Sequence, residues 1–198
     1  MEESLHTEVP GADEHLSLAL VDSVSRAGRG GRHDELGTAD AVRVWLLARD
    51  LIDPDAVLYE YCRGRIVQLR DDLRDLFEAQ VGGHAPSPGA VHALNHALTS
   101  APGVMLLRFE PTMGFIRSAD HPATQVVEHV MALIAEDAAT LLAGDEASML
   151  ASCEADGCEW FFLRTHARRQ WCSTRCGDRV RAARAYARKR AALNAEMS

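Results

Sequence analysis

The sequence has 198 residues, a formal net charge of −8, five cysteines and 47% hydrophobic residues. These values fit one soluble globular domain, or one domain with a small appendage, and exclude a disordered chain. No apolar run approaches the roughly 18 uncharged residues of a membrane span. The acidic first residues lack the basic and apolar segments of a secretory signal, so we expect a cytoplasmic protein with no membrane partner. In that reducing compartment, clustered cysteines indicate a metal site rather than disulfides.

The charge is divided unevenly along the chain. Residues 1–152 contain 11 arginines, no lysine and 24 acidic residues, which gives −13. Residues 153–198 contain 10 basic and 5 acidic residues, which gives +5, and all the basic ones lie between Arg164 and Arg190. This asymmetry predicts two parts, an acidic body and a basic arm that binds a polyanion.

The first predicted elements are short. Residues 1–14 have few apolar side chains and are expected to be flexible, and residues 15–24 are predicted as a helix in preference to a strand. The glycine-rich segment Arg26–Arg32 lacks the spacing of a phosphate-binding loop, so it is interpreted as a flexible connection. Thr38 is a candidate N-cap for a helix over residues 39–52.

The next helix has the most regular periodicity in the chain. Pro54 suits its first turn, and Gly82-Gly83 is expected to end it. Its apolar residues recur every three or four positions, as in one buried helix face. These residues are Leu58, Cys62, Ile66, Leu69, Leu73 and Leu76. Cys62 is therefore interpreted as a buried core thiol, and the arginines and aspartates between the apolar positions are predicted to face solvent.

A short helix over residues 91–98 places His92 and His96 four positions apart, which is a spacing that metal-binding pairs use. No third ligand or HExxH pattern accompanies them, so exposed surface histidines are the preferred interpretation. Residues 104–109 and 114–117 predict a β-hairpin, and residues 123–143 predict a long helix that stops at Gly144. We find no nucleophile motif or suitably placed pair of carboxylates, so the chain is not predicted to be an enzyme.

The remaining four cysteines follow a metal-site pattern, C-x4-C, thirteen residues, then C-x3-C; they are Cys153, Cys158, Cys172 and Cys176. Two close pairs separated by a short segment can surround one tetrahedral zinc ion. Four cysteine ligands leave no position for water, so the expected zinc is structural. His166 could replace a cysteine, but its place inside the spacer disfavours this. A unit of about forty residues needs the metal in order to fold.

The spacer and the last segment complete the predicted zinc module. Residues 159–164 are expected to form a strand that leaves the first knuckle, and a second strand would return through Gln170-Trp171. Asp178 is a candidate N-cap for a final helix rich in alanine and arginine. Val180, Ala183 and Ala187 would form a narrow seam on which this helix lies against the zinc knuckle.

The final helix carries six basic residues and no acidic residue between Arg179 and Arg190. Ordinary solvated faces mix both signs, so this surface is predicted to bind phosphates. The candidate DNA-binding residues are Arg168, Arg169, Arg175, Arg179, Arg181, Arg184, Arg188, Lys189 and Arg190.

At these residues the sequence resembles the CGNR zinc-finger family, which is named for a Cys-Gly-Asn-Arg signature at the last ligand. Here the signature reads Cys176-Gly177-Asp178-Arg179, after Arg168-Arg169-Gln170-Trp171-Cys172-Ser173. The acidic part is similar to the ABATE domain that this family usually carries, described as a stress-induced transcription regulator. The resemblance implies the four cysteine ligands named above and DNA binding. Asp178 replaces the signature Asn and adds a negative charge beside the expected DNA-facing surface.

The expected fold is mainly α with a small β-hairpin (α+β). We expect a flexible segment at 1–14, a helical ABATE-like domain at 15–150, and a CGNR-like, zinc-ribbon-like module with a basic helix at 151–198. The expected function is a bacterial-type transcription regulator with one structural Zn²⁺ that binds double-stranded DNA. Its N-terminal domain would sense a small-molecule effector or form a homodimer. The alternatives are a zinc-stabilised module that binds protein or RNA, and an enzyme with its site in the N-terminal domain.

Overall fold

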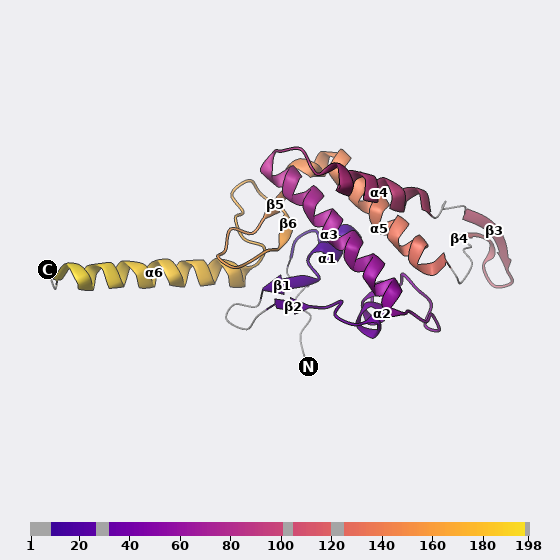
Figure 1. The fold of residues 1–198 in the computed structure, drawn as a ribbon, viewed down its shortest axis with the longest axis horizontal. Coiled ribbons are helices and arrows are strands. Elements are labelled where there is room, and N and C mark those ends of the chain that lie inside the picture. Colours follow the sequence, from indigo (N-terminus) through magenta and orange to yellow (C-terminus); the bar gives the residue numbers. More distant parts are fainter. Residues whose placement is uncertain (1–8, 27–31, 101–104, 120–124, 197–198) are drawn as a thin grey trace.

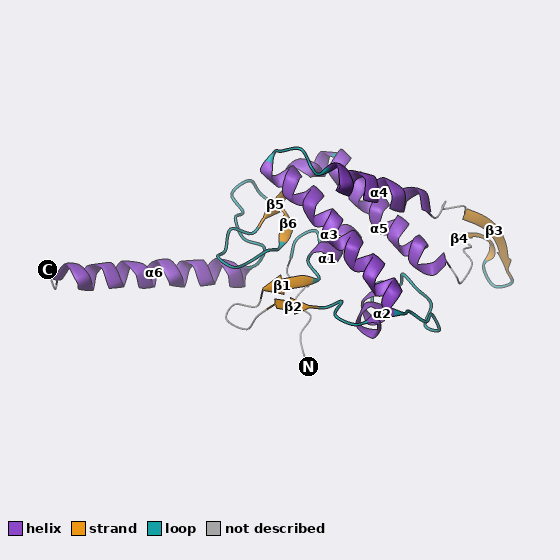
Figure 2. Ribbon diagram, viewed as in Figure 1, coloured by secondary structure: helices purple, strands orange, loops and turns teal. Residues whose placement is uncertain are grey.

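The structure is a computed structural model that describes residues 9–26, 32–100, 105–119 and 125–196. A helical body occupies the centre, a hairpin projects from one end, and a long C-terminal helix projects from the opposite end (Figure 1). Helices dominate the described chain, and the strands are short (Figure 2). No described helix is both long enough and apolar enough to cross a membrane.

The helices in chain order are α1 (Leu16–Val21), α2 (Ala39–Leu47), α3 (Glu60–Gly82), α4 (Pro88–Ser100), α5 (Val126–Ala143), the 3-10 helix η2 (Asp145–Met149) and α6 (Thr174–Glu196). The strands are β1 (Val24–Arg26), β2 (Arg32–Asp34), β3 (Met105–Glu110), β4 (Gly114–Ala119), β5 (Leu150–Ser152) and β6 (Phe161–Leu163). Consecutive strands pair antiparallel into three two-stranded sheets. This confirms the expected α+β class.

The core of the body lies between α1, α3, α4 and α5. The predicted apolar face of α5 is buried throughout; its members are Val127, Val130, Ile134, Ala138 and Leu141. Gly144 ends α5 as predicted, in an extended conformation. A Cβ at this position would lie 2.7 Å from the carbonyl oxygen of Thr140, so the close approach of the backbone requires glycine.

The predicted ends of α2 and α3 are partly wrong. Thr38 does cap α2, since its side chain accepts the N–H of Ala41, but the helix ends at Leu47 and not at residue 52. The next helix begins at Glu60, so Pro54 is not in its first turn. The connection between them is irregular because the Arg43 guanidinium donates hydrogen bonds to backbone carbonyls within it, at 3.0 Å for Ala56.

The apolar face of α3 is buried as predicted from Ile66 to Leu76, but three residues depart from the prediction. Leu58 lies before the helix begins and is only partly buried. Cys62 packs against the core while remaining partly exposed, so it is not the fully buried thiol that was expected. Arg70 was placed on the solvated face, yet it is only 1% exposed. Its guanidinium is paired with the carboxylate of Asp34 at the end of β2.

The predicted flexible N-terminus does not hold for residues 9–14, while residues 1–8 lie outside the described chain. Val9 and Ala12 are buried in a small apolar cluster with the cysteine module. Pro10 accepts a hydrogen bond of 2.9 Å from the backbone N–H of Leu163 in β6. The start of the chain therefore connects the body with the cysteine module.

Three other predictions from the acidic part can be compared with the structure. The β3–β4 hairpin is present, with Phe109 opposite Phe115 in its register. His92 and His96 are exposed on α4, and no third candidate ligand joins them among the described residues. The glycine-rich connection falls largely on residues 27–31, which lie outside the described chain.

The β5–β6 hairpin of the cysteine module reaches into the hydrophobic core of the body. Phe161 and Leu163 of β6 belong to the main core cluster together with residues of α1 and α3. The ring of Phe161 meets that of Phe77 on α3 edge-to-face, with 5.7 Å between the ring centroids. The module is therefore anchored on the body by apolar burial as well as by the chain itself.

Candidate metal centre and nucleic-acid interface

The first cysteine knuckle lies between β5 and β6. Cys153 follows β5 and donates its backbone N–H to the carbonyl of Trp160 at 2.9 Å, while Cys158 donates to the carbonyl of Ala155 at 2.9 Å. Gly157 has a φ of 69°, which suits glycine in this tight turn. These bonds fold the loop so that both sulfurs face the same point.

The strand partner in the module differs from the prediction. The predicted strand at residues 159–164 is present as β6, but it pairs with β5 and not with residues near Gln170-Trp171. β5 and β6 flank the same knuckle, so they close a local hairpin with little loop entropy. The returning segment is joined to the first knuckle by two hydrogen bonds: the N–H of Glu154 donates to the carbonyl of Gln170 at 3.0 Å, and the N–H of Cys172 donates to the sulfur of Cys153 at 3.4 Å.

The second knuckle is the start of α6. Cys172 precedes the helix, and Cys176 lies in its first turn. The hydroxyl of Ser173 accepts the backbone N–H of Cys176 at 3.3 Å, which is the bond of an N-cap. The predicted N-cap at Asp178 is therefore wrong, because the helix begins four residues earlier, at Thr174. The last cysteine thus lies on a regular helix.

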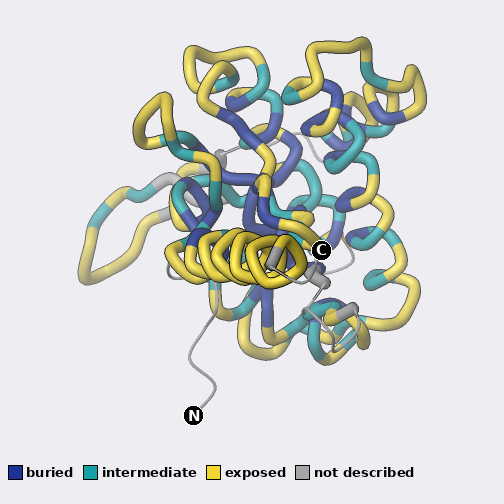
Figure 3. The backbone as a smooth tube through the Cα atoms, turned by 90° about the vertical axis from the view of Figure 1, so that its left-hand side faces the viewer, coloured by how far each residue is buried: buried dark blue, intermediate teal, exposed yellow. Residues whose placement is uncertain are grey.

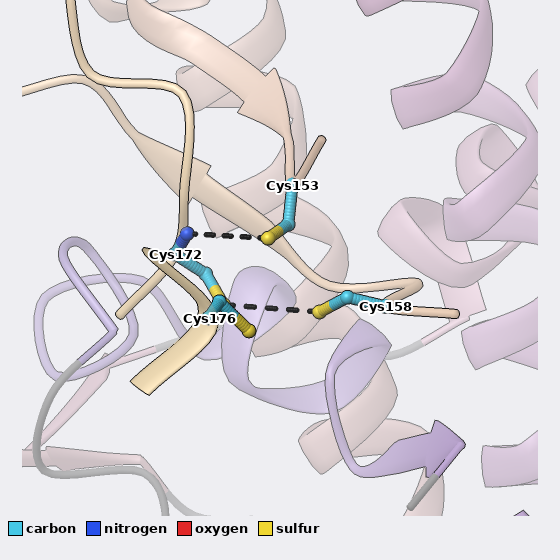
Figure 4. A group of neighbouring side chains, drawn as sticks. All are labelled: Cys153, Cys158, Cys172 and Cys176. Carbon is cyan, nitrogen blue, oxygen red and sulfur yellow. Dashed lines mark hydrogen bonds between the residues drawn. The ribbon is translucent and has the colours of Figure 1, made fainter. Parts of the chain in front are cut away.

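The four sulfurs converge on one point from these two knuckles (Figure 4). All four Sγ atoms lie within 4.8 Å of one another, with 3.8 Å between Cys158 and Cys172 and 3.7 Å between Cys172 and Cys176. A tetrahedron with zinc–sulfur bonds of about 2.3 Å has sulfur–sulfur edges of about 3.8 Å. The cysteines therefore fit one structural zinc ion. No other cluster of three or more candidate ligands occurs among the described residues.

The electrostatics of the metal-free cluster point to the same chemistry. Hydrogen bonds from the thiols of Cys158 and Cys172 lower the pKa of Cys153 to about 2. The bond to Cys153 raises the pKa of Cys158 to about 12, and bonds to Cys153 and Cys158 raise the pKa of Cys172 as well. A cation is required before all four sulfurs can ionise together. Zinc binding must therefore release protons, and acid weakens it.

Two arginines brace the knuckles. Arg169 donates to the carbonyls of Trp171 at 3.0 Å and Cys172 at 2.8 Å. Arg179 donates to the carbonyl of Asp156 at 3.0 Å and lies 3.8 Å from the sulfur of Cys176. Arg179 thereby brings a positive charge beside the cluster. Both were predicted to contact DNA, but these bonds give them a role inside the module.

Comparison with family models agrees with this architecture. The model of ABATE, described as "Putative stress-induced transcription regulator", matches residues 14–145. The chain belongs to the ABATE family. The model of the CGNR zinc finger matches residues 149–189 of this ABATE protein, which includes all four clustered cysteines. Both families are of regulator and zinc-finger type rather than enzyme type, and no curated protein is similar enough to count as a relative.

From the second knuckle onward, α6 leads away from the body of the ABATE protein. Every residue from 181 to 195 is exposed, and the tube view shows exposed backbone around the whole helix (Figure 3). Val180 packs beside the cysteine cluster, but Ala183 and Ala187 are exposed, so the predicted seam ends after its first residue. With 23 residues, α6 is about 34 Å long.

The basic residues of the module fall into two groups. Arg181 is held by Asp178 at 2.7 Å and lies 5.7 Å from the ring centre of Trp171, while Arg169 and Arg179 brace the knuckles. The side chains of the other group are exposed and make no hydrogen bond or ion pair with any described residue. Its members are Arg168, Arg175, Arg184, Arg188, Lys189 and Arg190.

Two residues at the junction of body and module belong to none of the predicted sites. Asp22 is fully buried, and its Oδ1 accepts the N–H of Phe161 at 3.0 Å. Arg74 on α3 donates to the carbonyls of Val21 at 2.7 Å and Glu159 at 2.9 Å. An aspartate directly after the apolar run LALV was the available signal for Asp22.

Burial raises the pKa of Asp22 well above its ordinary value, although the bond from Phe161 and the charge of Arg74 oppose this effect. Its second oxygen is buried without a hydrogen-bond partner. A cleft of about 470 Å³ lies nearby, and both parts of the chain line it, including Arg74 and Glu78 from α3 and Ser152 from β5.

Proposed function

We propose that this ABATE protein is a transcription regulator that binds double-stranded DNA through α6, with the CGNR finger as a rigid base. The observation that carries the proposal is a helix exposed on all sides that holds six basic and no acidic residues between Arg179 and Arg190. An α-helix about 10–12 Å across fits a major groove about 12 Å wide.

The zinc ligands in this proposal are the four clustered cysteines. α6 has no contact with the body beyond Val180, so its direction depends on Cys172 and Cys176 at its start. A metal bound at these residues joins the helix to the first knuckle, which β6 anchors in the core. Zinc would therefore hold the helix in a fixed orientation without taking part in DNA contacts.

The predicted DNA-binding residues can be divided according to the hydrogen bonds and ion pairs that their side chains make within the protein. Arg184, Arg188, Lys189 and Arg190 follow one another along the free part of α6, and Arg175 lies at its start. We propose these five, with Arg168 from the spacer, as the phosphate contacts. Arg181 would contribute when DNA displaces Asp178, whereas Arg169 and Arg179 act inside the module.

The charge distribution supports binding by α6 rather than by the body. The body carries −13, and DNA is repelled by it, so attachment must be confined to the projecting helix. In Figure 1, α6 extends away from the body, so DNA bound to α6 would lie apart from the acidic body. The same geometry leaves the helix accessible from all sides.

Binding of a fluorescent DNA duplex by the zinc-loaded full chain, measured by anisotropy over a salt series, tests the proposal. The six proposed phosphate contacts predict a slope of log affinity against log salt of roughly −5. We expect Arg184→Ala to reduce the slope by about one unit for all sequences, and Arg63→Ala on the body to leave it unchanged. A flat salt dependence would overturn the proposal.

The alternative partners are distinguished in the same assay. Duplex and single-stranded RNA of equal length serve as competitors, and preference for either would favour the RNA-binding alternative. Binding to neither nucleic acid would favour a protein partner. The expected small-molecule effector stays a prediction; we propose the cleft beside Arg74 as its place, because a ligand there would contact both the body and the module. A screen for compounds whose binding Arg74→Ala abolishes tests that placement.

A further inference from the structure

The β3–β4 hairpin carries an apolar surface that no described element covers. It projects from the end of the body opposite α6 (Figure 1). Leu107 is 67% exposed, Phe109 63%, Met113 70% and Phe115 73%. Phe109 and Phe115 lie opposite each other across the strands and meet edge-to-face with 5.2 Å between ring centroids. Together these four side chains form what we name the hairpin patch.

Such a hairpin needs a partner. A single two-stranded hairpin is marginally stable in water, and further strands or a packed face are needed to stabilise it. No other described helix or strand packs on this hairpin to an extent comparable with the contact between its own strands. Contiguous apolar patches of a few hundred Å² on soluble proteins commonly mark interaction sites.

A groove with several apolar and small lining residues lies between α3, α4 and α5. Its volume is about 590 Å³. Its apolar and small lining residues are Tyr61, Gly64, Leu69, Ala93, Ala97 and Met131, and its polar lining residues are Arg65, Gln68, Asp72 and His96. The small residues open the groove, since a Cβ on Gly64 would have no atom within 4 Å. We name it the α3–α5 groove.

The patch and the groove belong to the same end of the molecule. α4 ends at Ser100, shortly before β3, and α5 begins at Val126, shortly after β4. The groove residues of these helices lie in the last turns of α4 and the first turns of α5. Two copies that meet at this end can therefore each offer a patch and a groove to the other.

We propose that the hairpin patch of one copy binds in the α3–α5 groove of a second copy, and that the exchange is reciprocal. A two-fold dimer of this kind is closed, because both patches and both grooves are filled and no further copy can add.

The area is sufficient for a specific dimer. Each phenylalanine covers about 150–250 Å² when fully buried. The reciprocal contact buries four phenylalanines, two leucines and two methionines, counted over both copies. The buried surface area of these side chains then reaches about 1,000 Å², which is the lower bound for a specific interface. We therefore expect a dimer of moderate affinity whose two α6 helices lie at its opposite ends.

The mass of the zinc-loaded full chain in solution, measured by light scattering and sedimentation over a concentration series, tests the proposal. We expect a dimer for the unaltered chain. The double variant Phe109→Ser with Phe115→Ser removes the patch, and Gly64→Trp fills the groove; each should weaken dimerisation by about 100-fold or more. Val44→Ser replaces an equally exposed apolar residue on α2 and should leave the mass unchanged. Circular dichroism and zinc content verify the folding of every variant.

Mixing the patch variant with the Gly64→Trp variant gives the decisive result. One copy then has an intact groove and the other an intact patch, so one of the two contacts is restored and mixed dimers should form although each variant alone is monomeric. A dimer that Gly64→Trp does not weaken would mean that hairpins meet face to face, and would overturn the proposal. A monomer at every concentration would overturn it too, since the patch would then serve its own groove or another partner.

Discussion

The guanidinium of Arg70 and the carboxylate of Asp34 form a two-bond pair inside the body. The Nη1–Oδ1 distance is 2.6 Å and the Nη2–Oδ2 distance is 2.9 Å. Arg70 also donates to the hydroxyl of Ser23 at 3.2 Å, and Asp34 accepts the backbone N–H of Leu36 at 2.9 Å. The pair therefore fastens the β1–β2 hairpin to the middle of α3.

We expect Arg70→Ala to lower the free energy of unfolding by about 3–5 kcal/mol, because it removes a buried guanidinium that donates two hydrogen bonds to the Asp34 carboxylate and one to the Ser23 hydroxyl. Urea unfolding of the zinc-loaded protein measures this. Arg63→Ala is the matched control: it removes an exposed pair with Glu60 on the same helix and should cost less than about 1 kcal/mol. Equal losses in the two variants would contradict a structural role for the buried pair.

We expect one zinc ion per chain, and we expect Cys172→Ser to abolish it. A bound zinc of this kind contributes about 10–16 kcal/mol to the folding of a small module. The variant should lose the order of the knuckles and of α6 but keep most of the helices of the body. Metal analysis and hydrogen exchange measure the two effects. Cys62→Ser, which changes the cysteine outside the cluster, should bind zinc normally.

Asp22 predicts a pH dependence of stability. Its pKa is raised in the folded state, so the folded protein holds the proton more tightly than the unfolded chain. This contribution to stability is complete below the unfolded pKa and is lost as the pH rises toward the folded pKa, by at most about 1.4 kcal/mol per pH unit. We expect Asp22→Asn to flatten this decline, which begins above the unfolded pKa of about 3.9. Urea unfolding at saturating zinc measures it.

The control for this prediction is Asp145→Asn, which changes an exposed carboxyl of η2 and should leave the pH dependence as it is. A variant at Asp22 that kept the slope of the unaltered protein would show that another group titrates.

Asp178 predicts a gain of DNA binding on substitution. Its carboxylate holds Arg181 at 2.7 Å, so Asp178→Asn would free that arginine and remove a negative charge from the binding helix. We expect tighter binding and a salt slope more negative by up to about one unit. Asp55→Asn on the body should leave the anisotropy titration unchanged. Weaker binding by Asp178→Asn would mean that the contact orients Arg181 for DNA.

Features that depend on neighbours along the chain could be predicted from the residues alone. The spacing of Cys153, Cys158, Cys172 and Cys176 predicts one four-sulfur cluster because each close pair can bend round a single ion. The periodicity of α3 and α5 predicts their buried faces, since residues three or four apart share one side of a helix. Gly83 ends α3 in a left-handed conformation, as its type suggests.

The tertiary structure alone decided the features that join distant segments. The burial of Arg70 depends on Asp34, 36 residues earlier, and a charged residue within an amphipathic pattern carries no mark of such a partner. The contact of Val9 and Ala12 with the cysteine module and the bond from Phe161 to Asp22 are likewise long-range. Local propensity describes each segment in isolation. The contacts at the junction stabilise the fold only when distant segments are already packed together. The junction between body and zinc module therefore could not be predicted from the sequence.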